Sequence, residues 1–178
     1  MKKFTLACFM ICLGTFGIQA QEIAGIDASP LDISVFRTGG RNGQTVARAI
    51  YSRPAKKGRT IFGGLVPYGK IWRTGANEST ELNIFKDLSI GGKILKAGNY
   101  TMYTIPGEKE WTIIINSKLN TWGTYNYDES KDVMRFEVPV SSISKVNENF
   151  GIAFDGKDGK GKLLLAWDKT EIYIDFEY

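Results

Sequence analysis

Regular alternation of apolar and polar residues is the feature of this sequence that most limits its possible folds. In Thr170–Glu177, the apolar residues Ile172, Ile174 and Phe176 stand at every second position, with mostly charged residues between them. Side chains of a β-strand point alternately to opposite faces, so such a segment buries one face and leaves the other in water. The segment is therefore predicted to be a strand of an antiparallel sheet.

Similar runs, separated by Gly, Asn and Asp, recur from Leu31 onward, and no segment has the spacing of an amphipathic helix. About ten short strands within the length of one domain predict two antiparallel sheets packed face to face. We therefore expect one all-β domain over residues 31–178, a β-sandwich of jelly-roll type, with a partly closed barrel as the alternative. The further runs are Ile33–Arg37, Thr45–Ser52, Glu81–Phe85, Asn99–Ile105, Glu110–Asn116, Met134–Val138, Phe150–Phe154 and Lys162–Trp167.

Glycine-rich segments between these runs predict the turns. Gly91-Gly92 separates two apolar triplets and predicts a two-residue hairpin turn, because both glycines tolerate positive φ. Asp155–Gly161 predicts a longer loop between two strands. Thr38–Gly43 joins two strands and opens no helix, so it is interpreted as a turn and not as a phosphate-binding loop.

The N-terminus has the features of a secretory signal peptide over residues 1–20. Lys2 and Lys3 precede an apolar run, Phe4–Ile18, and Ala20 offers a small residue before Gln21. A helix over this run would rise about 22 Å, short of the roughly 30 Å hydrocarbon core of a bilayer. We expect cleavage after Ala20, no stable membrane span, and an exported protein that is periplasmic or extracellular.

Both cysteines, Cys8 and Cys12, lie within the predicted signal peptide. The mature protein would then contain no thiol and no disulfide. Lipid attachment at Cys8, which follows the small residue Ala7, is the alternative, although few apolar residues precede it. Residues 21–30 show no periodicity and are predicted to be a flexible lead-in.

Composition excludes several kinds of chemistry. The chain has no histidine, so neither a Ser-His-Asp nor a Cys-His catalytic arrangement is possible, and imidazole or thiolate metal sites are not expected. Lys and Arg number 23 and Asp and Glu 19, a near balance that argues against a general nucleic-acid-binding protein. Asp155–Gly161 lacks the ligand spacing of a calcium loop. No metal site and no cofactor are predicted.

The segment Arg53–Ser79 is long for a connection between strands and is rich in Gly, Arg, Lys and aromatic residues. Long ordered loops on a rigid sheet are common places for binding sites. Guanidinium groups recognise carboxylate, sulfate or phosphate, and aromatic faces stack on sugars. The residues predicted to bind a ligand are Arg53, Arg59, Tyr68, Trp72, Arg73 and Asn77.

A structural explanation of the same residues stays open. The aromatic side chains would pack the loop onto the sheet, and the arginines would form ion pairs with Glu78, Asp128 or Asp132. Arg73 fits a ligand contact and a loop-pinning role equally well.

A long pattern in this segment, Gly-Arg-x-Ile-Phe-Gly-Gly-Leu-Val-Pro-Tyr-Gly-x-x-Trp-Arg-Thr-Gly-Ala-Asn, resembles the bacterial family catalogued as domain of unknown function 2911. The resemblance implies a secreted protein of a Gram-negative bacterium, with one domain behind a signal peptide and no established activity. It extends over nearly the whole mature chain and includes Tyr51–Thr80, Ala97–Tyr100, Ile105–Trp111, Trp122-Gly123, and Tyr127 with Asp132 and Arg135.

These observations favour a non-enzymatic envelope module that binds a glycan or another anionic small molecule through the loop Arg53–Asn77. One alternative is a carboxylate-based polysaccharide hydrolase or lyase that uses Glu78 or the acids Asp128, Glu129 and Asp132. Another is a structural or partner-binding envelope protein, which would expose a large apolar patch. Whether the protein is an enzyme is left open by the sequence.

Overall fold

The structure is a computed structural model that describes residues 23–178, so the predicted signal peptide and cleavage point lie outside the described residues. Residues 23–30 form no strand and lead into a sheet of nine antiparallel strands. The elements are β1 (Leu31–Arg37), β2 (Thr45–Ser52), β3 (Thr80–Ile84), β4 (Leu88–Ile90), β5 (Lys93–Leu95), β6 (Gly98–Pro106), β7 (Glu110–Asn116), a 3₁₀ helix η1 (Glu129–Lys131), β8 (Asp132–Lys157) and β9 (Lys160–Glu177).

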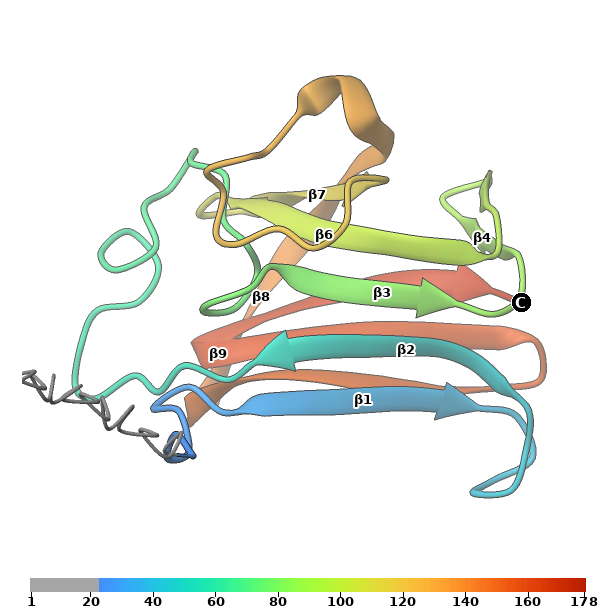
Figure 1. The fold of residues 1–178 in the computed structure, drawn as a ribbon, viewed down its shortest axis with the longest axis horizontal. Coiled ribbons are helices and arrows are strands. Elements are labelled where there is room, and N and C mark those ends of the chain that lie inside the picture. The colour runs from blue at the N-terminus through green and yellow to red at the C-terminus, as the bar shows by residue number, and fades with distance from the viewer. Residues whose placement is uncertain (1–22) are drawn as a thin grey trace, which may run out of the picture.

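The strands follow the order β1-β2-β3-β6-β7-β8-β9-β4-β5, and the sheet folds back on itself into two layers. The first five of these strands form the front layer in Figure 1, and β9 lies behind them. β8 joins the layers, because its first part pairs with β7 and its later part pairs with β9. The predicted antiparallel β-sandwich is confirmed, and within the described residues the sheet does not close into a barrel.

The expectation of about ten short strands is wrong in its details, because β8 and β9 are each one long bent strand. Each contains two of the alternating runs detected in the sequence. The runs are separated by bends, where the pairing register of β8 shifts on either side of Asn147 and where Asp168 has a φ of 53°. Local alternation fails at such bends, but hydrogen bonding to the neighbouring strand continues beyond them.

Two tight turns are built on left-handed residues. The Gly91-Gly92 turn is confirmed, with φ values of 57° and 77°. The expected long loop over Asp155–Gly161 is wrong: β8 extends to Lys157, and β9 begins at Lys160. Asp158 and Gly159 alone make this turn, with φ values of 54° and 82°. The three residues before this turn and the two after it, all interpreted as loop, belong to the ladder.

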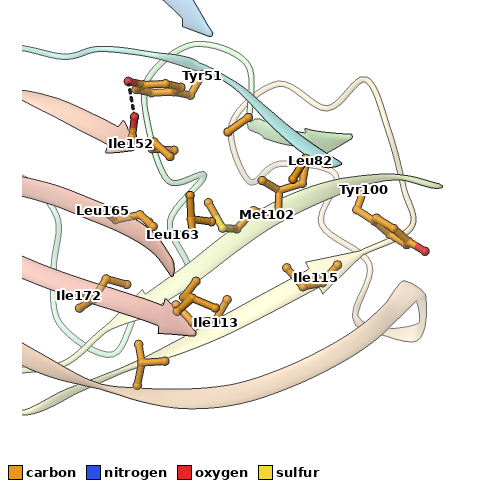
Figure 2. Close-up of a cluster of buried hydrophobic side chains, with 14 of the residues drawn as sticks. Tyr51, Leu82, Tyr100, Met102, Ile113, Ile115, Ile152, Leu163, Leu165 and Ile172 are labelled. Atoms are coloured by element: carbon orange, nitrogen blue, oxygen red, sulfur yellow. Dashed lines mark hydrogen bonds between the residues drawn. The ribbon is translucent and has the colours of Figure 1, made fainter. Parts of the chain in front are cut away.

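Apolar side chains from both layers meet in one core (Figure 2). Met102 of β6 and Ile113 of β7 face Leu163 and Leu165 of β9, and each of the four side chains is buried. The hydroxyl of Tyr51 donates to the carbonyl of Ile152 across the core, at 3.2 Å. Burial of a side chain of this size contributes roughly 1.5–3 kcal/mol, so packing between the layers is the main source of stability.

An aromatic cluster fills the core at the end where the Arg53–Ser79 segment crosses the sandwich. Trp72 stacks on Trp167 with ring centroids 5.9 Å apart, and Phe62 meets Trp111 edge-on at 4.7 Å. Phe150 completes the cluster beside Trp72, at 5.2 Å. The segment is therefore fastened to the core by its own aromatic side chains. No helix within residues 23–178 is long and apolar enough to cross a membrane.

Candidate functional site

The Arg53–Ser79 segment runs along one end of the two layers, at the left of Figure 1, and is held by the strands on both sides. The backbone of Trp72 makes two hydrogen bonds with Thr104 of β6, at 2.7 and 3.0 Å. At the start of the segment, Lys56 Nζ contacts Asp168 Oδ2 of β9 at 2.6 Å and donates to the carbonyl of Arg59 at 2.8 Å. The segment is therefore an ordered platform fixed to both layers.

Strained backbone follows directly after Arg73. Thr74 is fully buried and has a φ of 57°, in the left-handed region that β-branched residues rarely occupy. Its carbonyl accepts from Thr80 Oγ1 at 2.6 Å, and its hydroxyl lies 3.1 Å from Thr104 Oγ1. Such a conformation costs on the order of 1–3 kcal/mol and is typically found at functional sites. It directs the Arg73 backbone into one fixed orientation.

A cleft of about 480 Å³ opens in this segment, and we call it the basic cleft. Its charged lining residues are Arg59, Lys70 and Arg73, and no Asp or Glu of the described chain lines it. Asn77 and Thr124 add polar groups at its border. None of the three cations forms an ion pair within residues 23–178. The cleft therefore carries an uncompensated positive charge, which favours an anion.

The guanidinium groups of the basic cleft are only partly satisfied by the protein. Arg73 Nε is buried and has no hydrogen-bond partner in the described part of the chain. Its Nη1 lies so near Gly123 that a Cβ there would be 3.1 Å away. Arg59 donates from Nε and Nη2 to the carbonyls of Lys56 and Ala55, at 2.9 and 2.6 Å, which orients the group without neutralising it. Buried donors of this kind normally have a partner.

Four of the six residues predicted to bind a ligand line this cleft: Arg59, Trp72, Arg73 and Asn77. Trp72 is only 9% exposed and donates its indole N–H to the carbonyl of Gly75 at 3.1 Å, so it forms a wall of the cleft and offers no free face for stacking. The structure brings these four residues together around one opening.

The other two predicted ligand residues, Arg53 and Tyr68, do not line the cleft. Arg53 Nη1 contacts Asp32 Oδ2 of β1 at 3.1 Å, and Arg53 Nε donates to the carbonyl of Phe150. Tyr68 lies on the outer surface with its ring against Gly63. The expected ion pairs between the arginines of the segment and Glu78, Asp128 or Asp132 are not formed, and Arg53 pairs with a residue of β1 instead.

A second cleft of about 490 Å³ adjoins the first, and we call it the acidic cleft. Asp27, Glu78 and Glu81 line it, and no Lys or Arg of residues 23–178 does. The segment between β7 and β8 reaches this end of the molecule (Figure 1) and contributes Trp122, which is 53% exposed. Glu78 and Trp122 are paired in an antiparallel bridge.

Asn77 and Ser29 line both clefts and mark their junction. Asn77 has a φ of 58°, and its Nδ2 donates to Asp27 Oδ1 at 3.1 Å. The backbone N–H of Ser29 donates to the same oxygen at 2.6 Å. These two donors, Ser29 first, lower the pKa of Asp27 below its usual range, so its carboxylate stays ionised.

The carboxylates considered for catalysis near η1 belong to a separate network. Asp132 accepts from Asn116 Nδ2 at 2.8 Å and from the Tyr127 hydroxyl at 2.7 Å, and its Oδ2 lies 3.0 Å from Arg135 Nη2. Burial, followed by the neighbouring Asp132 carboxylate, raises the pKa of Tyr127 to about 12. This network pins the β7–β8 connection. No cluster of Asp or Glu within residues 23–178 has the arrangement of a metal site.

Several residues of the two clefts were not chosen from the sequence, among them Asp27, Lys70, Glu81 and Trp122. Lys70 lies within the predicted segment, and its charge was the available signal. Glu81 and Trp122 come from β3 and from the β7–β8 connection, far along the chain. Their contribution depends on the strand order, which the alternation pattern does not contain.

Comparison with known proteins agrees with the motif that runs through this site. No curated protein and no solved structure matches the chain. The sequence model of the family described as "Protein of unknown function (DUF2911)" matches residues 36–176, which include the segment, both layers of the sandwich and most residues of the two clefts. The chain therefore belongs to the DUF2911 family of proteins of unknown function.

Proposed function

We propose that the protein is an exported, non-enzymatic module that binds an anionic small molecule or the anionic groups of a glycan in the basic cleft. The observation that carries this proposal is the presence of three cations, Arg59, Lys70 and Arg73, around one cleft that no acidic residue of the described chain lines. Unpaired positive charges in a concave, partly desolvated site attract anions more strongly than the same charges on open surface.

Arg73 is the expected anchor of the ligand. Its backbone is fixed by the bonds around Trp72 and Thr74, and its buried Nε has no partner within residues 23–178. Arg59 is oriented by two carbonyls and keeps its positive charge available. A carboxylate, sulfate or phosphate accepts two parallel hydrogen bonds from such a group. Preorganised donors of this kind bind without a large ordering cost.

The test is calorimetric titration of the purified protein with phosphate, sulfate and oligogalacturonate. Arg73→Ala should weaken binding roughly 10- to 100-fold, the range expected for a hydrogen bond between charged groups. Arg41→Ala is the matched control, since Arg41 lies in the β1–β2 turn at the opposite end of the molecule in Figure 1. Equal affinities for the wild type and Arg73→Ala, with both proteins folded, would place the ligand elsewhere.

Export is part of the proposal and needs its own measurement. We expect the full chain, expressed in a Gram-negative host, to be recovered outside the cytoplasm with Gln21 at its N-terminus. Intact-mass spectrometry of the periplasmic and medium fractions tests this. A product that keeps residues 1–20, or one that carries a lipid, would contradict cleavage after Ala20.

A carboxylate-based polysaccharide hydrolase is a second candidate, because Glu78 shares the acidic cleft with Glu81 and Asp27. Asp27 does not suit the general acid of such an enzyme, since its pKa is lowered and a general acid requires a raised one. Reducing-sugar release from acidic polysaccharides, abolished in Glu78→Gln but retained in Glu137→Gln, would favour the enzyme. Binding without turnover favours the module proposed here.

A further inference from the structure

The two clefts adjoin at shared lining residues and carry charges of opposite sign. The basic cleft is lined by three cations and the acidic cleft by three carboxylates, and the clefts meet at Ser29 and Asn77. None of these six charged groups pairs with another charged side chain within residues 23–178. Each cleft therefore carries an uncompensated charge, positive in the basic cleft and negative in the acidic cleft.

The acidic cleft has the components of an ammonium site. Glu78 and Trp122 are opposite each other in an antiparallel bridge, which places their side chains on one face with Cβ atoms about 4.5–5.5 Å apart. The bridge is fixed by two flanking hydrogen bonds, from Ser79 N to Thr121 O at 3.0 Å and from Gly123 N to Asn77 O at 3.1 Å. A cation there would contact a carboxylate and the exposed face of an indole together.

The acidic cleft also argues against a ligand with negative charge along its whole length. A polyanion that extends from Arg73 past Asn77 would bring its next charged group toward Glu78 and Glu81, and like charges repel. A ligand with a positive group at that position would be attracted at both ends. Asn77, with an amide donor and an amide acceptor, fits the polar middle of either ligand.

We propose that the ligand is a zwitterion: its phosphate or carboxylate occupies the basic cleft, and a free ammonium group occupies the acidic cleft between Glu78 and Trp122. This inference rests on the proposed function, because it assumes that the anionic group is bound by Arg59 and Arg73. An amino sugar with an acidic substituent and a phosphoethanolamine headgroup both have this chemistry.

The experiment compares sugar phosphates that differ only at carbon 2. Glucosamine 6-phosphate, N-acetylglucosamine 6-phosphate and glucose 6-phosphate are titrated into the purified protein at pH 6, where the free amine is protonated. O-phosphoethanolamine and its N-acetyl derivative repeat the comparison without a sugar ring. We expect each free amine to bind roughly fivefold more tightly than its acetylated counterpart, as an exposed charge pair with a cation–π contact allows.

Variants test the acidic cleft separately from the basic cleft. Glu78→Gln and Trp122→Leu should each reduce the preference for the free amine toward onefold while binding of glucose 6-phosphate is retained. Glu137→Gln, which removes an exposed charge outside both clefts, should leave the preference unchanged. If the free amine is preferred only among the sugar phosphates, an amino sugar is the source of the ammonium group. If the free amine is preferred among the sugar phosphates and also in the phosphoethanolamine pair, the zwitterion itself is the recognised feature.

Two outcomes distinguish the failure of this inference from that of the proposed function. Equal affinity for free and acetylated amines, with loss of all binding in Arg73→Ala, overturns the ammonium site and leaves the anion site intact. Failure of the wild type to bind any of these phosphates, or inorganic phosphate itself, refutes both.

Discussion

The ion pair between Lys56 and Asp168 offers a sharp test of how the site segment is held. Lys56 Nζ lies 2.6 Å from Asp168 Oδ2, and the two side chains are only 20% and 24% exposed. The same ammonium donates to the carbonyl of Arg59 at 2.8 Å. Lys56→Met would keep most of the apolar stem but leave a largely shielded carboxylate and a carbonyl without their donor.

The expected cost lies between two measured limits. Exposed pairs contribute about 0.2–1 kcal/mol, and removal of one partner of a fully buried pair costs about 3–5 kcal/mol. With about three-quarters of each side chain shielded, we expect a loss of about 2 kcal/mol in the free energy of unfolding. For a domain of this length, that lowers Tm by about 4–8 °C.

The assay is thermal unfolding followed by circular dichroism, with Lys96→Met as the matched control. Lys96 and Asp87 have a similar separation, 2.8 Å, but are 75% and 47% exposed. The control should unfold at the temperature of the wild type. A double-mutant cycle with Asp168→Asn should assign most of the loss to the pair itself. Equally small changes in Tm for the two lysine variants, or a coupling free energy near zero, would refute the argument that shielding from solvent strengthens the pair between Lys56 and Asp168.

Three further predictions concern the fold. The pKa of Tyr127 is raised to about 12 from its ordinary value of about 10. The stabilisation that the protonated hydroxyl of Tyr127 gives to the fold is therefore complete below pH 10 and is lost as the pH rises through 12. In urea unfolding at pH 8 and pH 11, the free energy of unfolding should fall less at the higher pH for Tyr127→Phe than for the wild type. Ile113→Ala, at a fully buried position, should cost about 3 kcal/mol in the same assay, and a cost below about 1 kcal/mol would contradict its place in the core. Gly159→Ala, at a φ of 82°, should cost about 1 kcal/mol, whereas an unchanged urea midpoint would show that the turn tolerates a side chain.

Two strands are predictable from the sequence to the residue. The bounds of β2 and β7 coincide with the predicted runs Thr45–Ser52 and Glu110–Asn116, because each strand has one buried face throughout its length. β8 is not predictable in this way, since residues 141–149 are mostly exposed and are kept in the ladder by their pairing with β9. That pairing is a tertiary contact, which local periodicity does not encode.

Only the part of the site that is formed by the single segment Arg53–Ser79 is predictable from the sequence. The density of Arg and aromatic residues in Arg53–Ser79 indicates the basic cleft, because those side chains reach the same opening without help from distant strands. The role of Arg53 depends on the register of β1 and β2, which brings Asp32 within 3.1 Å. The acidic cleft needs β3 and the β7–β8 connection beside the lead-in, so it becomes visible only when the strand order is known.

The strand order also determines when the protein can fold. The β4–β5 hairpin is joined to the rest of the sheet through β9, with Ser89 opposite Glu177. The second layer therefore cannot assemble around β4 until Thr170–Glu177 has been synthesised, although β4 leaves the ribosome much earlier. Pairings between such distant segments form slowly, because the intervening chain must be closed into a loop first. The second layer thus stays incomplete until the last strand of the chain has been made.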